Sequence, residues 1–224
     1  MNFLGLFEIE RKTDVLALTA FLLSALSAFY QFGILVFGPK ATLIPPAAVT
    51  LYRFGGEKVP AYASVATSMS VAHTSNATEP LLVKMETATF ALGKKTINLM
   101  WHGQPESPIA DGETKFGKMN AIGPFIVDTK KIQSSLVVFA PQSKECGTDK
   151  TCDVNENFLS WNAFIDLLRD AMQKGETQLT VQFAAEFTNH RTVSVSCVIP
   201  LHPNQLHLLA TDNYVTERCA LEPS

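Results

Sequence analysis

The longest apolar run of the chain lies near its N-terminus, at residues 15–38, which read VLALTAFLLSALSAFYQFGILVFG and contain no charged side chain. A helix rises about 1.5 Å per residue, so roughly 20 residues cross the hydrocarbon core of a bilayer. A helix that is apolar on every side over such a length is typical of a membrane span. The pattern therefore predicts a transmembrane helix at residues 15–38.

Two interpretations of this run remain, because secretory signal peptides also begin with an apolar helix. A signal peptide has a shorter apolar core that ends at small residues, and the stretch at residues 25–27, ALS, could serve as such a cleavage site. The apolar run, however, continues past it to Gly38. The preceding segment also carries Glu8, Glu10 and Asp14, which signal peptides usually avoid. We therefore favour an uncleaved signal-anchor.

Basic residues on the two sides of the span set its expected orientation. Arg11 and Lys12 precede the span, and Lys40 follows it. The positive-inside rule then places residues 1–14 in the cytoplasm as a short tail. The remainder of the chain is expected in the periplasm or the extracellular space, and we favour the inner membrane of a bacterium.

Beyond the span, the pattern changes to short alternating segments. Residues 39–48 are proline-rich, and the Pro45-Pro46 pair favours an extended spacer. From residue 49 to residue 224, apolar and polar positions alternate in short runs that predict strands. The best-defined hairpin joins QLTVQFAAEF to RTVSVSCVI, and a second joins PLLVKMETATFAL to KTINLMWH. Consecutive strands without intervening helices favour an antiparallel β-sandwich.

The apolar period lengthens to three and four residues in one part of this domain, at residues 160–174. Trp161, Leu168 and Met172 fall on one side of the helix that this spacing predicts. Ser160 can cap its start and Gly175 can end it. The expected fold class is therefore mainly β (α+β): an N-terminal transmembrane helix, then a β-sandwich-like domain with one amphipathic helix.

Charge and composition narrow the range of partners. The net charge is −3, and charged residues make up 17% of the 224 residues, below the quarter that is typical of soluble domains. The low charged fraction is expected of a domain of ordinary composition that is joined to an uncharged membrane segment. Nucleic-acid binding requires a basic surface, so we expect no nucleic-acid partner.

All four cysteines follow the predicted span: Cys146, Cys152, Cys197 and Cys219. An even number of cysteines in an oxidising compartment favours disulfides. We favour one bond between Cys146 and Cys152, which would close a small polar loop, and one between Cys197 and Cys219, which would hold the C-terminal segment. Four cysteines allow three pairings, so the alternatives stay open. The spacings fit neither a zinc site nor a C-x-x-C redox motif.

Motifs that resemble known sites each fail at a required position. GETKFGK matches a phosphate-binding loop, but Met119 stands where the magnesium-binding hydroxyl is needed. DVNEN resembles the start of an EF-hand loop, but Phe158 replaces the glycine and Phe164 the final glutamate. No nucleophile motif such as G-x-S-x-G is present. We therefore predict no catalytic, cofactor-binding or metal-binding residues.

The leading hypothesis is a non-catalytic, single-pass membrane protein whose outer domain binds another protein in a membrane-associated complex. The bilayer would contact residues 15–38, and the partner would be a membrane protein or a second copy of the chain. Long polar loops on a rigid sheet often carry function, so we expect contacts from the loop PESPIADGETKFGKMN, through Lys115, Phe116 and Lys118, and from the loop between Cys146 and Cys152.

Two alternatives make different predictions. A membrane-tethered hydrolase of the cell envelope requires a serine or a carboxylate beside one of four histidines, because such sites are defined by geometry and not by sequence order. These are His73, His102, His202 and His207. A small-ligand sensor requires an apolar pocket inside the β domain.

Overall fold

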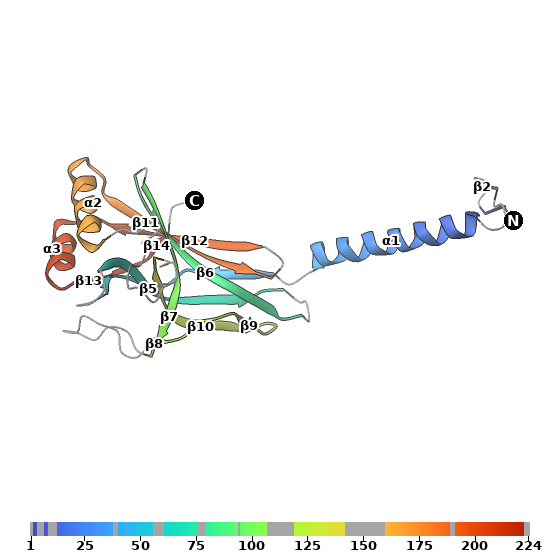
Figure 1. Ribbon diagram of the computed structural model, residues 1–224, viewed down its shortest axis with the longest axis horizontal. Helices are drawn as coiled ribbons and strands as arrows, with labels where there is room; N and C mark the ends of the chain where they lie inside the picture. Colours follow the sequence, from blue (N-terminus) through green and yellow to red (C-terminus); the bar gives the residue numbers. More distant parts are fainter. Residues whose placement is uncertain are drawn as a thin grey trace, which may run out of the picture.

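The computed structural model describes residues 2–3, 7–8, 13–37, 40–55, 61–75, 79–93, 95–106, 119–141, 160–188 and 191–221. A 25-residue helix, α1 (Thr13–Phe37), extends away from one end of a β-rich body (Figure 1). The shorter helices α2 (Trp161–Gln173) and α3 (Pro203–Thr211) cover the opposite end of that body. Near the N-terminus, the two-residue strands β1 (Asn2–Phe3) and β2 (Phe7–Glu8) pair with each other.

Twelve strands form one antiparallel sheet, in the order β13-β4-β5-β10-β7-β6-β11-β12-β14, with β3 beside β5, β8 beside β7 and β9 beside β6. Their bounds are β3 (Ala41–Ile44), β4 (Ala48–Phe54), β5 (Tyr62–His73), β6 (Leu81–Leu92), β7 (Lys95–Pro105), β8 (Met119–Asn120), β9 (Phe125–Val127), β10 (Ile132–Ala140), β11 (Gln178–Phe187), β12 (Thr192–Pro200), β13 (Tyr214–Arg218) and β14 (Ala220–Leu221).

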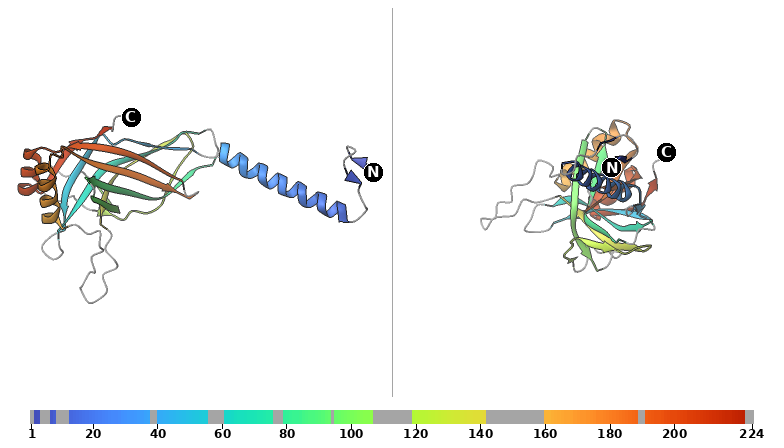
Figure 2. Two further views of the ribbon diagram at one scale, coloured as in Figure 1. Left: turned by 90° about the horizontal axis from the view of Figure 1, so that it is seen from above. Right: turned by 90° about the vertical axis from the view of Figure 1, so that its right-hand side faces the viewer.

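The C-terminal segment brings the two edges of this sheet together. β13 pairs with β4 at one end of the strand order, and β14 pairs with β12 at the other end. Only Cys219 separates these two strands in the chain. The sheet therefore curls into a nearly closed barrel (Figure 2). Closure matters physically because it covers backbone groups that open edges would leave unpaired.

Large apolar side chains fill the barrel. Phe139 and Phe183 are completely buried, with ring centroids 5.7 Å apart. Phe164 of α2 packs against Phe90 of β6 at 5.5 Å, so the helix closes one end of the core. The core is continuous from the strands into both short helices, which makes the barrel and its cap one hydrophobic unit.

Helix α2 confirms the predicted amphipathic helix almost to the residue. The Ser160 side chain accepts a hydrogen bond from the backbone N–H of Ala163 at its start. Gly175 follows its end with a φ of 90°, a conformation that glycine adopts without strain. Burial of one side, including Trp161 and Leu168, fixes the helix on the barrel.

The structure corrects three other expectations. The β domain is one barrel-like sheet and not a sandwich of two sheets. The expected spacer at residues 39–48 is not wholly a spacer, because Ala41–Ile44 pairs with β5 and β4 begins at Ala48. A second short helix, α3, begins at Pro203, where the sequence pattern predicted no helix; proline is tolerated at the first helical position because no hydrogen bond from its nitrogen is needed there.

The predicted membrane span remains an expectation. Counted over the residues that the structure describes, no helix is both long enough and apolar enough to cross a bilayer.

Candidate functional site

An aromatic cluster lies on the outer surface of the barrel, formed by β4, β5 and β7. Phe54 stands at its centre. Its ring centroid lies 5.2 Å from Tyr62, 4.8 Å from His102 and 6.0 Å from Tyr52. We call these four residues the outer aromatic cluster. They lie on the outer surface because Val49 and Leu51, at the alternate positions of β4, are buried in the barrel core.

The four rings differ in how much water they meet. Tyr52 is buried, Phe54 and Tyr62 are half-buried, and His102 is exposed. Tyr52 belongs to a small second cluster with the buried residues Ala66 and Val138. The site is thus a partly open aromatic surface on a packed base.

The cluster is uncharged near neutral pH, and burial shifts its pKa values further in that direction. Burial raises the pKa of Tyr52 well above its usual value, helped by the neighbouring Tyr62. It also raises the pKa of Tyr62 to about 12. Partial burial against Phe54 lowers the pKa of His102, which favours the neutral imidazole. The surface therefore offers ring faces and polar ring atoms without net charge.

The polypeptide around the cluster is fixed by long-range hydrogen bonds. The backbone N–H of Arg53 donates to the carbonyl oxygen of Asn213 at 2.8 Å, and its guanidinium donates to the Asn213 side-chain oxygen at 3.3 Å. These bonds hold the turn after α3 against β4. Tyr214, the next residue, packs at the edge of the same surface.

Two further parts of the chain, the strand β8 and the residue before α2, contact this surface. Met119 of β8 packs against the cluster, and β8 pairs with β7 through Gln104 and Pro105. Ser160, just before α2, forms an isolated bridge with Tyr62. The expected contact loop between β7 and β8 therefore begins and ends beside the cluster. Its residues Lys115, Phe116 and Lys118 lie outside the described residues, as does the expected Cys146–Cys152 loop.

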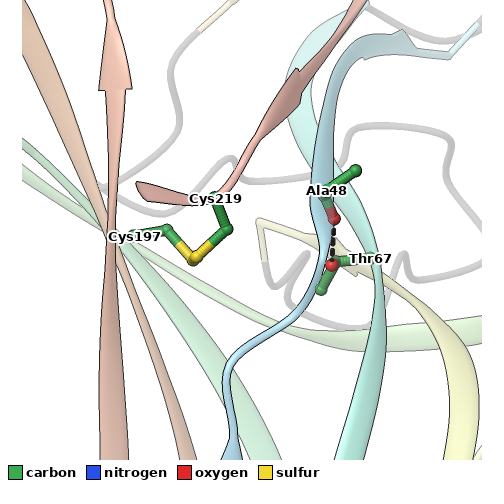
Figure 3. The surroundings of a disulfide bond; sticks show 4 residues. All are labelled: Ala48, Thr67, Cys197 and Cys219. Atoms are coloured by element: carbon green, nitrogen blue, oxygen red, sulfur yellow. Dashed lines mark hydrogen bonds between the residues drawn. A yellow bond between two sulfur atoms is a disulfide. The ribbon is translucent and has the colours of Figure 1, made fainter. Parts of the chain in front are cut away.

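Cys197 and Cys219 form a disulfide with their Cα atoms 4.9 Å apart, in agreement with the favoured pairing (Figure 3). The bond joins β12 to the short connection between β13 and β14. Nearby, the Thr67 hydroxyl donates to the carbonyl oxygen of Ala48 at 2.6 Å. Cys146 and Cys152 lie outside the described residues.

The four histidines of the hydrolase alternative do not form a catalytic group within the described residues. His73 Nε2 lies 3.0 Å from the backbone oxygen of Glu79. His102 packs on Phe54. The backbone N–H of His202 donates to the Gln205 side chain, and the backbone oxygen of His207 accepts from Thr211. No cluster of metal-ligating side chains occurs in the described part of the chain.

The cavity that the described residues form at the capped end of the barrel is too small for the sensor alternative. This cavity, of about 10 Å³, lies between α2, α3 and the barrel end, lined by Leu51, Leu168, Ile199 and Leu209 among others. This space approximates a single water molecule, whereas ligand pockets occupy roughly 300–1,000 Å³.

One buried polar residue was not anticipated from the sequence. Glu86 of β6 is completely buried, and neither carboxylate oxygen has a hydrogen-bond partner among the described residues. Burial raises its pKa to about 7. Glu86 occupies the packed barrel interior, so it is a feature of the core and not part of the outer site.

Comparison with known protein families, with curated proteins and with solved structures found no match for this chain.

Proposed function

We propose that this protein is anchored in a membrane by a single helix and that its β-barrel domain binds another protein within a membrane-associated complex. The outer aromatic cluster carries the binding part of this proposal. Aromatic side chains are enriched in protein interfaces because they bury a large area with few rotatable bonds.

The anchor is inferred from the uncharged apolar run at residues 15–38, and the exposure of side chains on α1 (Thr13–Phe37) supports it. The large apolar side chains of α1 are exposed along the described part of the helix: Leu18, Phe21, Leu22, Leu23, Leu26, Phe29 and Tyr30. Apolar surface of this extent is costly in water and favourable in lipid.

The disulfide supports the proposed location of the barrel. Disulfides persist in the periplasm and outside cells, whereas cytosolic thiols are kept reduced. The Cys197–Cys219 bond therefore favours a barrel beyond the membrane, with residues 1–14 on the cytoplasmic side. This orientation agrees with the basic residues before the span.

The position of the cluster supports a partner that contacts the barrel on its outer surface, at the end farther from the membrane. Tyr62 begins β5 and bridges Ser160 of the α2 start, so the cluster belongs to the end of the barrel opposite α1 (Figure 1). A second membrane protein with its own outer domain, or a second copy of this chain, could contact this surface without entering the bilayer.

Co-purification from native membranes tests the proposal. Tagged full-length protein would be isolated in mild detergent, and a stoichiometric companion identified by mass spectrometry. We expect Phe54→Ala combined with His102→Ala to lose that companion, because the two rings contact each other at the open side of the cluster.

The matched control is Leu221→Ser, which alters an exposed apolar residue away from the cluster. It should retain the companion. Thermal unfolding of each variant would show that the barrel is intact. A wild-type protein that is isolated alone and monodisperse, or equal recovery from all variants, would reject the binding role.

A further inference from the structure

Only two residues separate the end of α1 from the part of the chain that the barrel holds. Phe37 ends the helix, and Lys40 is already held by the barrel. The Lys40 carbonyl accepts from the backbone N–H of Thr74 at 2.9 Å, and the Lys40 N–H donates to Ser75 at 3.1 Å. Three residue steps reach at most about 11 Å. A membrane-embedded α1 would therefore hold this end of the barrel at the headgroups.

The turn between β9 and β10 lies at the same end. The backbone N–H of His73 donates to the carbonyl oxygen of Lys131 at 3.0 Å, and His73 pairs with Ala41, the first residue of β3. The turn is thus separated by a single strand, β5, from the point where the chain leaves α1.

Two large aliphatic side chains flank this turn and are exposed to solvent. Ile126 and Ile132 are each 60% exposed, whereas Val127 between them is buried. Ile126 pairs with Leu82 of β6 and Ile132 with Ala72 of β5. Isolated exposed aliphatic residues are ordinary, but here two of them lie beside a basic turn at the end of the barrel that carries the anchor.

The charges at this end favour an anionic surface. Lys130 and Lys131 are both exposed in the turn, although Lys131 also forms an ion pair with Asp128 at 2.9 Å. Five basic and three acidic side chains are described at this end: Lys40, Lys84, Lys130, Lys131 and Arg191, with Glu79, Asp128 and Glu186. Basic residues beside aliphatic ones are the combination that binds the interface of anionic membranes.

We propose that the β9–β10 turn is a second membrane contact, in which Ile126 and Ile132 enter the interface of an anionic bilayer and Lys130 meets its phosphates. This proposal rests on the membrane anchor of the proposed function. The barrel would then stand end-on against the bilayer, with the outer aromatic cluster directed away from the lipid.

Tryptophan quenching in full-length protein tests the contact. Ile126→Trp and Ile132→Trp would be reconstituted separately into nanodiscs of phosphatidylcholine and phosphatidylglycerol, with or without bromine on the upper acyl chain. We expect brominated lipid to reduce the fluorescence of both variants below that of the wild type, whose Trp101 and Trp161 supply the background. Adding Lys130→Glu should weaken this quenching.

Two controls separate the possible failures. Tyr30→Trp reports insertion of α1, and Leu208→Trp, on α3, reports the opposite end of the barrel. Quenching at Tyr30→Trp without quenching at the turn would overturn the second contact and leave the anchor in place. No quenching at Tyr30→Trp would reject the anchor as well. Equal quenching at Leu208→Trp would mean that the barrel lies flat, which would also contradict the proposal.

Discussion

The disulfide between Cys197 and Cys219 connects the two edges of the sheet. The Cys219 backbone N–H donates to the carbonyl oxygen of Ala47, beside β4, at 3.2 Å, while its sulfur is bonded to Cys197 of β12. One residue therefore contacts both sides of the seam at which the barrel closes. The disulfide, the pairing of β13 with β4 and the pairing of β14 with β12 therefore all stabilise the closure of the barrel at this seam.

We expect the double substitution Cys197→Ala and Cys219→Ala to lower the free energy of unfolding by about 3 kcal/mol, because the bond closes a 22-residue separation in the unfolded chain. Urea unfolding of the full-length protein in detergent would measure it. Alanine is preferred because Cys197 is completely buried and serine would add a buried hydroxyl. Cys146→Ala with Cys152→Ala is the comparison variant. Identical midpoints for wild type and the Cys197/Cys219 variant would refute this role.

Loss of the α2 cap should destabilise the protein modestly. Ser160→Ala removes the acceptor of the Ala163 N–H, which typically costs about 1 kcal/mol. Ser160→Asp retains a capping oxygen and should unfold close to the wild-type temperature. Thermal unfolding followed by circular dichroism would compare them. The capping interpretation fails if the aspartate variant loses as much stability as the alanine variant.

Local patterns in the sequence predicted most elements of the barrel. The hairpin of β11 and β12 was expected from alternation, and Leu179, Val181 and Phe183 are indeed buried together. The helix expected at residues 160–174 is α2. These elements are readable because residues close in the chain decide them: a period of two or of 3.6, bounded by turn residues.

Closure of the barrel could not be read in this way. The Thr50 and Thr216 hydroxyls lie 2.8 Å apart across β4 and β13, yet 166 positions separate them in the chain. Strand alternation shows that one side of a strand is buried, but it does not identify the neighbouring strand. A sandwich and a barrel give the same local pattern, and alternation alone does not bring β4, β5 and β7 together at the outer aromatic cluster.

A shift of register in β6 explains why Val83 and Glu86, three positions apart, both lie in the core. Glu186 of β11 pairs with Met85, but the next residue, Phe187, pairs with Val83. Lys84 is thus the extra residue. One additional residue reverses the side on which the following side chains lie, so Val83 and Glu86 both face inward.

The hydrogen bond from Thr67 to Ala48 should contribute more than a comparable bond outside the barrel. Thr67 is 2% exposed, so Thr67→Val leaves the volume almost unchanged and removes a buried donor. We expect a loss of about 1 kcal/mol in the free energy of unfolding. Thr50→Val removes the solvent-accessible bond to Thr216 and should cost less than about 0.5 kcal/mol. Equal losses in urea unfolding would contradict the difference in burial.

Glu86 should make the protein less stable as the pH rises. Its pKa is about 7 in the folded barrel, compared with an ordinary value of 4.5. The folded state therefore holds the proton more tightly, and the contribution of Glu86 to stability is most favourable below pH 4.5. Ionisation in the buried site then lowers the free energy of unfolding by about 3 kcal/mol as the pH passes through this interval to above 7.

Replacing this carboxyl with an apolar side chain of similar length should remove that loss. We expect Glu86→Met to be more stable than the wild type at pH 8, and the difference to shrink as the pH falls towards 4.5, because a protonated Glu86 costs less to bury. Glu186→Gln, on the neighbouring strand, is the matched control: Glu186 is 35% exposed and lies 4.0 Å from Lys84, so its pH dependence should follow that of the wild type. Urea unfolding across the pH range would decide, and a constant difference between Glu86→Met and wild type would show that the carboxyl does not titrate inside the barrel.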